Sequence, residues 1–99
     1  MAYEIDWTEL ANQDLEGVVR YIAEDNIDAA RELGLKIIST IEDTAAFPFS
    51  GRKVPEKNNP LIREKIVRSH YRVIYRLNEE EGTLSVARVW RTSQGEPEL

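Results

Sequence analysis

The chain contains no cysteine and only one histidine among its 99 residues. Without cysteine, neither a disulfide framework nor a thiolate site can form. Histidine-based acid–base or metal chemistry would depend on His70 alone. No apolar run approaches the ~20 residues that cross a bilayer, and no signal-peptide pattern begins the chain. We therefore expect a cytoplasmic protein without a membrane partner.

The sequence also lacks the short motifs that bind nucleotides or catalytic zinc. Neither G-x-x-x-x-G-K-[ST] nor G-x-G-x-x-G nor H-E-x-x-H occurs, so phosphate-binding loops and zinc-hydrolase sites are unsupported. His70 falls in an expected turn, where a surface role is favoured. We expect no metal and no cofactor.

Positive charge is scarce in the first half of the chain and concentrated in the second. Residues 1–50 contain three Lys/Arg and eleven Asp/Glu, a balance of −8, and residues 51–99 contain ten against seven, a balance of +3. Within residues 52–76, eight cations face two carboxylates, Glu56 and Glu64. Because salt screens charges beyond roughly 8 Å, such a local cluster can bind a polyanion despite the total of −5. The alternative is a solvated, salt-bridged sheet face.

The first half of the chain predicts a strand and two helices. Alternating apolar residues predict a strand over 3–7. Thr8 is a suitable N-cap for a helix over 9–24, and Asp28 for a second helix over 29–46. The short connection makes them an antiparallel pair. Gly34 lies inside the second helix, where glycine costs about 1 kcal/mol relative to alanine, and a close helix–helix contact is the expected reason.

The second half predicts three strands after a loop over 52–60. Residues 61–67 and 71–77 form a hairpin with its turn around 68–70, and 83–91 form the last strand. The order is β-α-α-β-β-β, an α+β fold in which an antiparallel sheet packs against a helical hairpin. A single domain covers 1–91. Residues 92–99 are a polar C-terminal tail that we expect to fray.

Side-chain alternation assigns faces to these strands. The odd-numbered residues of 71–77 are aromatic or aliphatic and share one face, with Arg72 and Arg76 on the other. Arg63 and Lys65 share a face of the preceding strand. Strand register decides whether all four cations look the same way, and one sequence leaves it open. In the last strand, the expected faces are Leu84 with Val86, and Ala87 with Val89 and Arg91.

Seven cations form the candidate binding cluster. Guanidinium groups bind phosphates bidentately and stabilise the charge that develops on a phosphoryl group during strand cleavage. Arginine is a poor general base, so cleavage would also need Lys65, Tyr71 or Tyr75, and both tyrosines are better explained as core residues. The cluster consists of Arg52, Lys53, Arg63, Lys65, Arg72, Arg76 and Arg91.

Several features occur together in an order that resembles one family. A strand is followed by a helix pair containing D-L-x-x-V-V-x-Y-I (residues 14–22), then by Pro48-x-x-Gly51-Arg52, and then by IRE…YRVIYR. From Tyr3 to Arg91 this pattern resembles the RelE/ParE superfamily, the toxins of type II toxin–antitoxin pairs that are often described as plasmid stabilisation proteins. The resemblance implies the α+β fold above and a cognate antitoxin, with a toxin dimer or a toxin–antitoxin hetero-oligomer as possible assemblies.

The resemblance leaves two activities open. RelE-like members enter the ribosome and cleave mRNA with cations of the sheet, which correspond here to Arg63, Lys65, Arg72 and Arg91. ParE-like members inhibit DNA gyrase by binding, and Arg52, Lys53 and Arg76 would then belong to the binding surface. Residues 92–99 contain neither the tyrosine nor the histidine that RelE-like proteins often have beyond the last strand. A ParE-like, non-enzymatic toxin is therefore favoured, with an mRNA endonuclease or a non-toxic binding member as alternatives.

Overall fold

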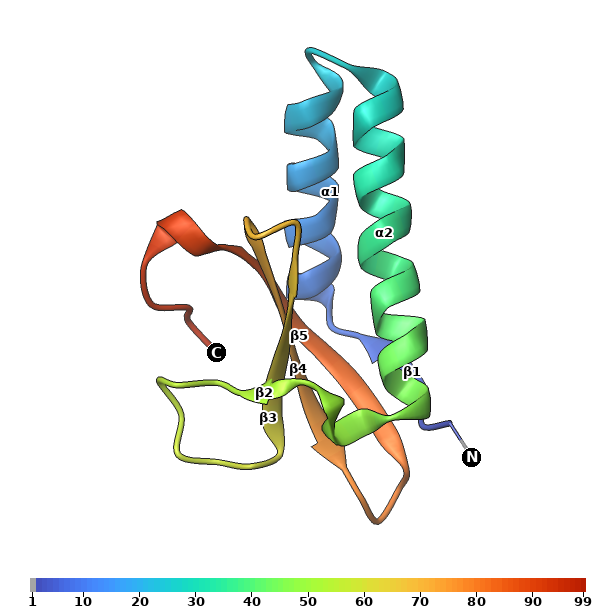
Figure 1. Cartoon of the computed structure of the whole chain (residues 1–99), viewed down its shortest axis with the longest axis vertical. Coiled ribbons are helices and arrows are strands. Elements are labelled where there is room, and N and C mark those ends of the chain that lie inside the picture. Colours follow the sequence, from blue (N-terminus) through green and yellow to red (C-terminus); the bar gives the residue numbers. More distant parts are fainter. Residues whose placement is uncertain (1) are drawn as a thin grey trace.

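The computed structural model describes residues 2–99 as two helices packed on a five-stranded sheet (Figure 1). The strands lie in the order β1-β5-β4-β3-β2. Neighbouring strands are antiparallel except β1, which pairs with β5 in parallel. The α+β fold predicted from the sequence is confirmed. Its elements are β1 (Glu4–Trp7), α1 (Glu9–Ala23), α2 (Ile27–Ala46), η1 (Pro48–Ser50), β2 (Arg52–Lys53), β3 (Ile62–Val67), β4 (Tyr71–Asn78), β5 (Thr83–Arg91) and η2 (Thr92–Gln94).

The two helices start at side-chain caps and pack closely against each other. The Thr8 hydroxyl accepts a hydrogen bond from the Ala11 N–H, as predicted. The second cap was predicted wrongly, because Asn26 rather than Asp28 starts α2, where its side chain accepts from the Ala29 N–H. Asn26 directly follows a two-residue turn, Glu24-Asp25, so only three residues separate α1 from α2. A Cβ on Gly34 would lie 3.3 Å from Val19 Cγ2, which confirms the close helix–helix contact.

The main core lies between the helix pair and one side of the sheet, called here the helix face. Leu33, Ile37 and Ile41 of α2 belong to one buried cluster with Val73 and Tyr75 of β4. Ile37 and Val73 are fully buried. The apolar periodicity of α2 and the alternation of β4 meet here, so burying this face fixes how the helices sit on the sheet. None of the helices within residues 2–99 is long and apolar enough to cross a membrane.

A β-bulge in β5 changes which of its residues reach the core. Ile74 pairs with Arg88 and Tyr75 with Val86, so one extra residue of β5, Ala87, lies between these pairs. The extra residue reverses the alternation, and Val89 packs on the helix face together with Val86. The expectation that Val89 lies opposite Leu84 and Val86 was therefore wrong. Nothing in the local sequence marks this bulge.

The opposite face of the sheet has a second, smaller apolar cluster. Val54, Ile62 and Ile74 are buried together, with Ala87 and Trp90 packed against them. Residues 52–60 were expected to be loop throughout, but Arg52–Lys53 pairs with β3 as the edge strand β2. The side of the sheet away from the helices therefore also buries apolar side chains.

The C-terminal tail folds back instead of fraying, which corrects the sequence expectation. Residues 92–94 form the turn η2, and the Trp90 indole N–H donates to the Gly95 carbonyl at 3.1 Å. Arg88 donates to the Glu98 carbonyl at 3.0 Å, and Pro97 is buried. These side-chain anchors on β5 hold a segment whose polar composition alone predicts mobility.

Candidate functional site

The register of the β3–β4 hairpin divides the predicted cation cluster between the two faces. Arg63 pairs with Tyr75, and Lys65 pairs with Val73, so both cations lie on the helix face. Arg72 pairs with Ile66 and therefore lies on the opposite face. The turn between these strands places Arg68 and Ser69 at positive φ, 53° and 62°, as a tight hairpin turn requires. The cations predicted as one catalytic set thus do not converge. Arg76, which pairs with Ile62, lies on the same face as Arg72.

Arg72 is held on the opposite face by two carboxylates. Its Nε donates to Glu64 Oε1 at 2.6 Å, and its two terminal nitrogens donate to the carboxylate oxygens of Glu56 at 2.8 and 2.9 Å. Arg72 is 7% exposed and Glu64 is 1% exposed. Arg52 donates to the second oxygen of Glu64. Every nitrogen of the Arg72 guanidinium therefore already binds an anion of the same chain.

This four-residue ion network, called here the Arg72 network, is balanced in charge and in hydrogen bonds. It contains the two cations Arg52 and Arg72 and the two anions Glu56 and Glu64. Burying a charge is costly unless it is paired and hydrogen-bonded. Within residues 2–99, no buried side-chain nitrogen or oxygen lacks a hydrogen-bond partner. The charges and hydrogen bonds of the Arg72 network are therefore satisfied within the folded chain.

The pKa shifts in the network follow from these contacts. Hydrogen bonds from Arg72 lower the pKa of the Glu56 carboxyl from 4.5 to about 2, against a smaller effect of burial in the other direction. The same hydrogen bonds raise the pKa of Arg72 above its ordinary value. Both groups therefore stay charged at physiological pH. A change of pH near neutrality does not release Arg72.

Arg63 holds the segment that follows α2. Its guanidinium donates to the carbonyls of Phe49, Gly51 and Pro60, at 3.2, 2.9 and 2.9 Å, and lies 4.9 Å from the centroid of the Phe49 ring. The contacts are to neutral carbonyls, so Arg63 keeps its positive charge uncompensated. Arg63 therefore stabilises the turn between η1 and β2, and its guanidinium does not line an open cationic groove.

Tyr75 is occupied in the same region. Its hydroxyl donates to the Pro48 carbonyl at 2.8 Å and accepts from the Gly51 N–H at 3.1 Å. Burial raises the pKa of this hydroxyl. A buried phenol with both hydrogen bonds made is a poor proton-transfer group for an external substrate. The prediction that Tyr75 is a core residue is confirmed.

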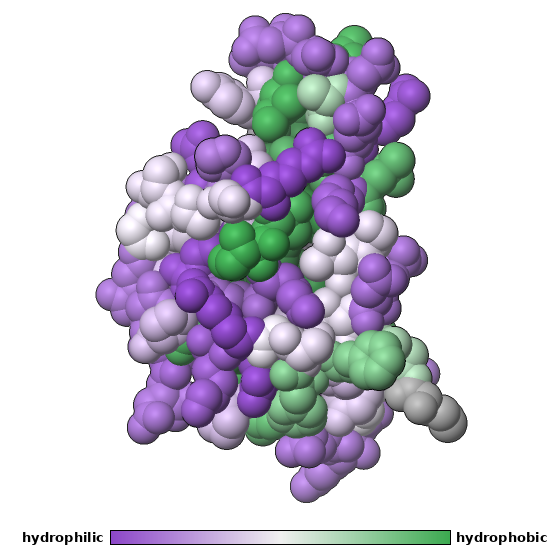
Figure 2. All heavy atoms as spheres, in the orientation of Figure 1, coloured by the Kyte–Doolittle hydropathy of each residue, from purple (hydrophilic) through white to green (hydrophobic). Residues whose placement is uncertain are grey.

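The remaining predicted cations lie in different places, with Lys53 and Arg76 exposed and Lys65 half-buried. Lys53 lies on the edge strand β2, and Arg76 lies on the face opposite the helices. Lys65 lines a recess of about 320 Å³ beside Asp43 and Phe47. Hydrophilic side chains cover much of the region around the loop after β2, whereas a hydrophobic strip reaches the surface beside the helices (Figure 2).

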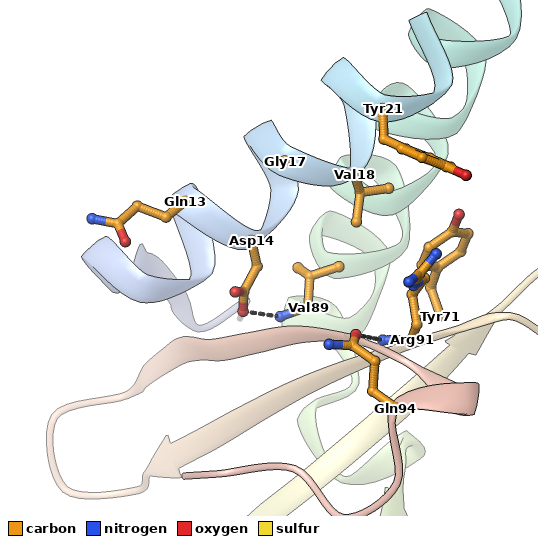
Figure 3. Close-up of a pocket in the computed structure, with 9 residues that line it drawn as sticks. All are labelled: Gln13, Asp14, Gly17, Val18, Tyr21, Tyr71, Val89, Arg91 and Gln94. Carbon is orange, nitrogen blue, oxygen red and sulfur yellow. Dashed lines mark hydrogen bonds between the residues drawn. The ribbon is translucent and has the colours of Figure 1, made fainter. Parts of the chain in front are cut away.

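A groove between α1 and the end of β5 was not predicted from the sequence (Figure 3). It encloses about 410 Å³, and Tyr21, Tyr71 and Arg91 lie at one end of it. The Arg91 guanidinium is 5.9 Å from the centroid of the Tyr21 ring. Gly17 leaves open space on the helix side, because nothing lies within 4 Å of a Cβ built there. The other lining residues are Gln13, Asp14, Val18, Val89 and Gln94.

Asp14 seals the part of β5 that β1 leaves unpaired. Its carboxylate accepts from the Val89 N–H at 3.0 Å and from two nitrogens of Arg88 at 2.8 and 3.0 Å. The Asp14 contacts raise the pKa of Arg88. The sequence did not predict this role for Asp14. Its position four residues before Val18 indicates that Asp14 lies beside the apolar stripe of α1 and hence near the sheet.

Within residues 2–99, His70 is not part of a group of side chains that could bind a metal. It is exposed in the hairpin turn, and its ring packs edge-on to Tyr71 at a centroid distance of 6.5 Å. Within residues 2–99, no three histidine, aspartate or glutamate side chains are grouped as a metal site would need. The surface role predicted for His70 is confirmed.

Comparison with known proteins assigns the family. Residues 5–95 match the family model described as ParE toxin of type II toxin-antitoxin system, parDE. The chain belongs to this family. No curated protein sequence matches it significantly.

Solved structures support the same fold. A chain of the chromosomal ParDE toxin–antitoxin system from P. aeruginosa superposes with a TM-score of 0.71 at 16% identity, covering 91% of this chain and 96% of that one. A mutant of the E. coli toxin RelE in the free state gives 0.72 at 18% identity, covering 96% and 88%. The toxin–antitoxin complex RelBE2 from Mycobacterium tuberculosis gives 0.58 at 22% identity, covering 92% and 99%. The ParE and RelE folds are thus both close to this one.

Proposed function

We propose that this toxin acts in the cytoplasm by binding DNA gyrase, without cleaving RNA, and is neutralised by a cognate antitoxin. The main support for this choice is that the Arg72 guanidinium is already paired with two carboxylates of the same chain. An arginine that stabilises a phosphoryl transition state needs donors directed at the phosphate. Here both terminal nitrogens of Arg72 bind Glu56, and Nε binds Glu64.

The separation of the other cations supports the same choice. Arg63 and Lys65 lie on the helix face, whereas Arg72 lies on the opposite face. A cleavage site also needs a group for proton transfer within hydrogen-bond reach of the reacting oxygen. The Tyr75 hydroxyl is buried in contacts to Pro48 and Gly51.

Two surfaces are available for protein partners. We assign Arg52, Lys53 and Arg76 to target binding, because all three are exposed. By strand pairing, Arg52 and Arg76 lie on the face opposite the helices, whereas Lys53 pairs with Arg63 at the edge of the helix face. The antitoxin is inferred from relatives, since the RelBE2 and ParDE structures are named as toxin–antitoxin systems. Exposed apolar side chains on α2, among them Leu35 at 60% exposure, supply a surface that an antitoxin could cover.

One specific feature favours the alternative of an mRNA endonuclease. Lys65 and Arg91 both lie on the helix face, at pairing positions to either side of β4, and neither forms an ion pair within residues 2–99. Lys65 could then supply the proton-transfer group that arginine cannot. This arrangement would work without Arg72.

Plasmid supercoiling tests the proposal directly. The chain is expressed without an antitoxin, and plasmid topology is compared with cells that express an Arg76→Gln, Lys53→Gln variant. We expect relaxed or cleaved plasmid with the wild-type chain and a weaker effect with the variant. Normal supercoiling at a level of expression that stops growth would contradict gyrase as the target.

A further inference from the structure

The contact between Arg72 and Glu56 has the geometry of an occupied oxyanion site. The two terminal nitrogens of Arg72 meet the two oxygens of one carboxylate at 2.8 and 2.9 Å. A phosphate offers the same pair of oxygens to the same planar fork. Glu64 holds the remaining nitrogen, Nε, and thereby fixes the direction of the fork.

We propose that Glu56 occupies, and keeps closed, a phosphate-binding site centred on Arg72. The two glutamates differ in accessibility. The Glu64 side chain is fully buried within the sheet, whereas the Glu56 side chain belongs to a loop and is 26% exposed. An incoming phosphate can therefore reach the position of the Glu56 carboxylate, and Glu64 would continue to orient Arg72.

The loop that carries Glu56 has anchors of its own. Val54 is buried in the second apolar cluster, and its N–H donates to the Ile62 carbonyl at 3.2 Å. The Lys57 N–H donates to the Val54 carbonyl, and the Asn59 side chain accepts from the Leu61 N–H. Glutamine at position 56 therefore removes the anion from the guanidinium of Arg72, while the loop keeps these anchors.

The positive charge around the two terminal nitrogens of Arg72 favours a phosphate once residue 56 is neutral. By strand pairing, Arg76 lies on the same face as Arg72, and Arg52 lies opposite Glu64. Arg52 and Arg72 then contact the single carboxylate of Glu64, and Arg76 lies on the same face of the sheet. Such a surface suits a chain of phosphates, as in a nucleic acid strand, better than one isolated anion. As folded, the wild-type chain presents Arg72 neutralised by Glu56.

The test compares two glutamate-to-glutamine variants with equal net charge. Glu56→Gln removes the carboxylate at the fork, and Glu80→Gln removes one from the exposed turn after β4. Binding of a fluorescein-labelled single-stranded RNA oligonucleotide is measured by anisotropy. We expect Glu56→Gln to bind about tenfold more tightly than wild type, with Glu80→Gln close to wild type, because only the first change frees a bidentate donor pair.

Inorganic phosphate distinguishes the source of the ligand. If phosphate raises the melting temperature of Glu56→Gln but the RNA does not bind, the site takes free phosphate. If both bind and compete, the site takes the phosphates of a strand. In either case we expect the Arg72 Nε–H resonance of the folded variant to shift on addition of phosphate, which locates the ligand without a second substitution.

Equal RNA affinities and equal phosphate responses for Glu56→Gln and Glu80→Gln, with both variants folded by circular dichroism, would overturn the proposal. So would binding that leaves the Arg72 resonance unmoved. The result does not depend on gyrase, because a wild-type chain that inhibits gyrase or fails to do so is compatible with either outcome.

Discussion

The helix face and the opposite face of the sheet use alternate residues of the same strands, yet they are held by different contacts. On the helix face, side chains such as Ile37 and Val73 are fully buried among apolar neighbours. On the opposite face, a small apolar cluster lies beside the buried ions Glu64 and Arg72. The first kind of contact is non-directional, and the second depends on exact partners. The faces should therefore respond differently to substitution, salt and pH.

The largest expected effect lies on the helix face. Ile37→Ala leaves a cavity among α2, β4 and β5, and we expect it to lower the free energy of unfolding by about 4 kcal/mol. Denaturant titration measures this change. Because the loss is apolar, it should be the same at about 0.1 M and about 1 M salt. A strong salt dependence would contradict the apolar character of this face.

Breaking the Arg72 network should cost slightly less. Glu64→Gln leaves Arg72 buried with one charged partner fewer, and we expect a loss of about 3 kcal/mol in the free energy of unfolding. The matched control is the double variant Glu64→Leu, Arg72→Met, which removes the central pair together and should recover most of the loss. A double variant as unstable as Glu64→Gln would show that the ion pair is not the source of the effect.

The contact between Gly51 and Tyr75 joins the segment between η1 and β2 to strand β4, and it should be sensitive to added volume. A Cβ at position 51 would lie 2.3 Å from the Tyr75 hydroxyl oxygen and 2.7 Å from the Glu64 carbonyl oxygen. We expect Gly51→Ala to destabilise by about 2 kcal/mol in thermal or denaturant unfolding. Gly17→Ala is the control, because open space surrounds that position and a helical alanine should stabilise by up to about 1 kcal/mol. Equal effects of the two alanines would contradict the geometry.

The smallest expected effect is the pH dependence that Glu56 contributes. Its folded pKa of about 2 lies below the ordinary 4.5, so its contribution is present above about pH 4.5 and is lost as the pH falls towards 2. Solvent screening reduces this contribution to about 1 kcal/mol. The free energy of unfolding of wild type should therefore fall more steeply with acid than that of Glu56→Gln. Parallel curves would indicate that Glu56 does not pair with Arg72 in solution.

The order of the two helices and the four longer strands was predictable from the sequence because each depends on local signals, whereas the two-residue strand β2 was missed. Thr8 marks the start of α1, Gly34 marks a close helix contact, and alternation marks β4. The position of the cations was not predictable. A one-residue change of register exchanges the two faces of a strand, and the bulge at Ala87 does so within β5 without a local signal.

The Arg72 network could not be predicted from the sequence for a related reason. Glu56 and Glu64 were visible as the only two carboxylates within a basic segment. That both would meet Arg72 depends on the pairing of β3 with β4 and on the path of the loop over 54–60. The sequence therefore shows which charged residues are present, whereas their contacts with one another could be learned only from the fold.

The most direct test of a binding toxin without nuclease activity is primer extension on mRNA translated by ribosomes in the presence of the purified chain. The closed state of Arg72 predicts full-length mRNA, with no cuts in phase with codons. Codon-phased cuts that require translation and disappear in Arg72→Ala would contradict the account. They would show that Arg72 leaves Glu56 and Glu64 to act on RNA.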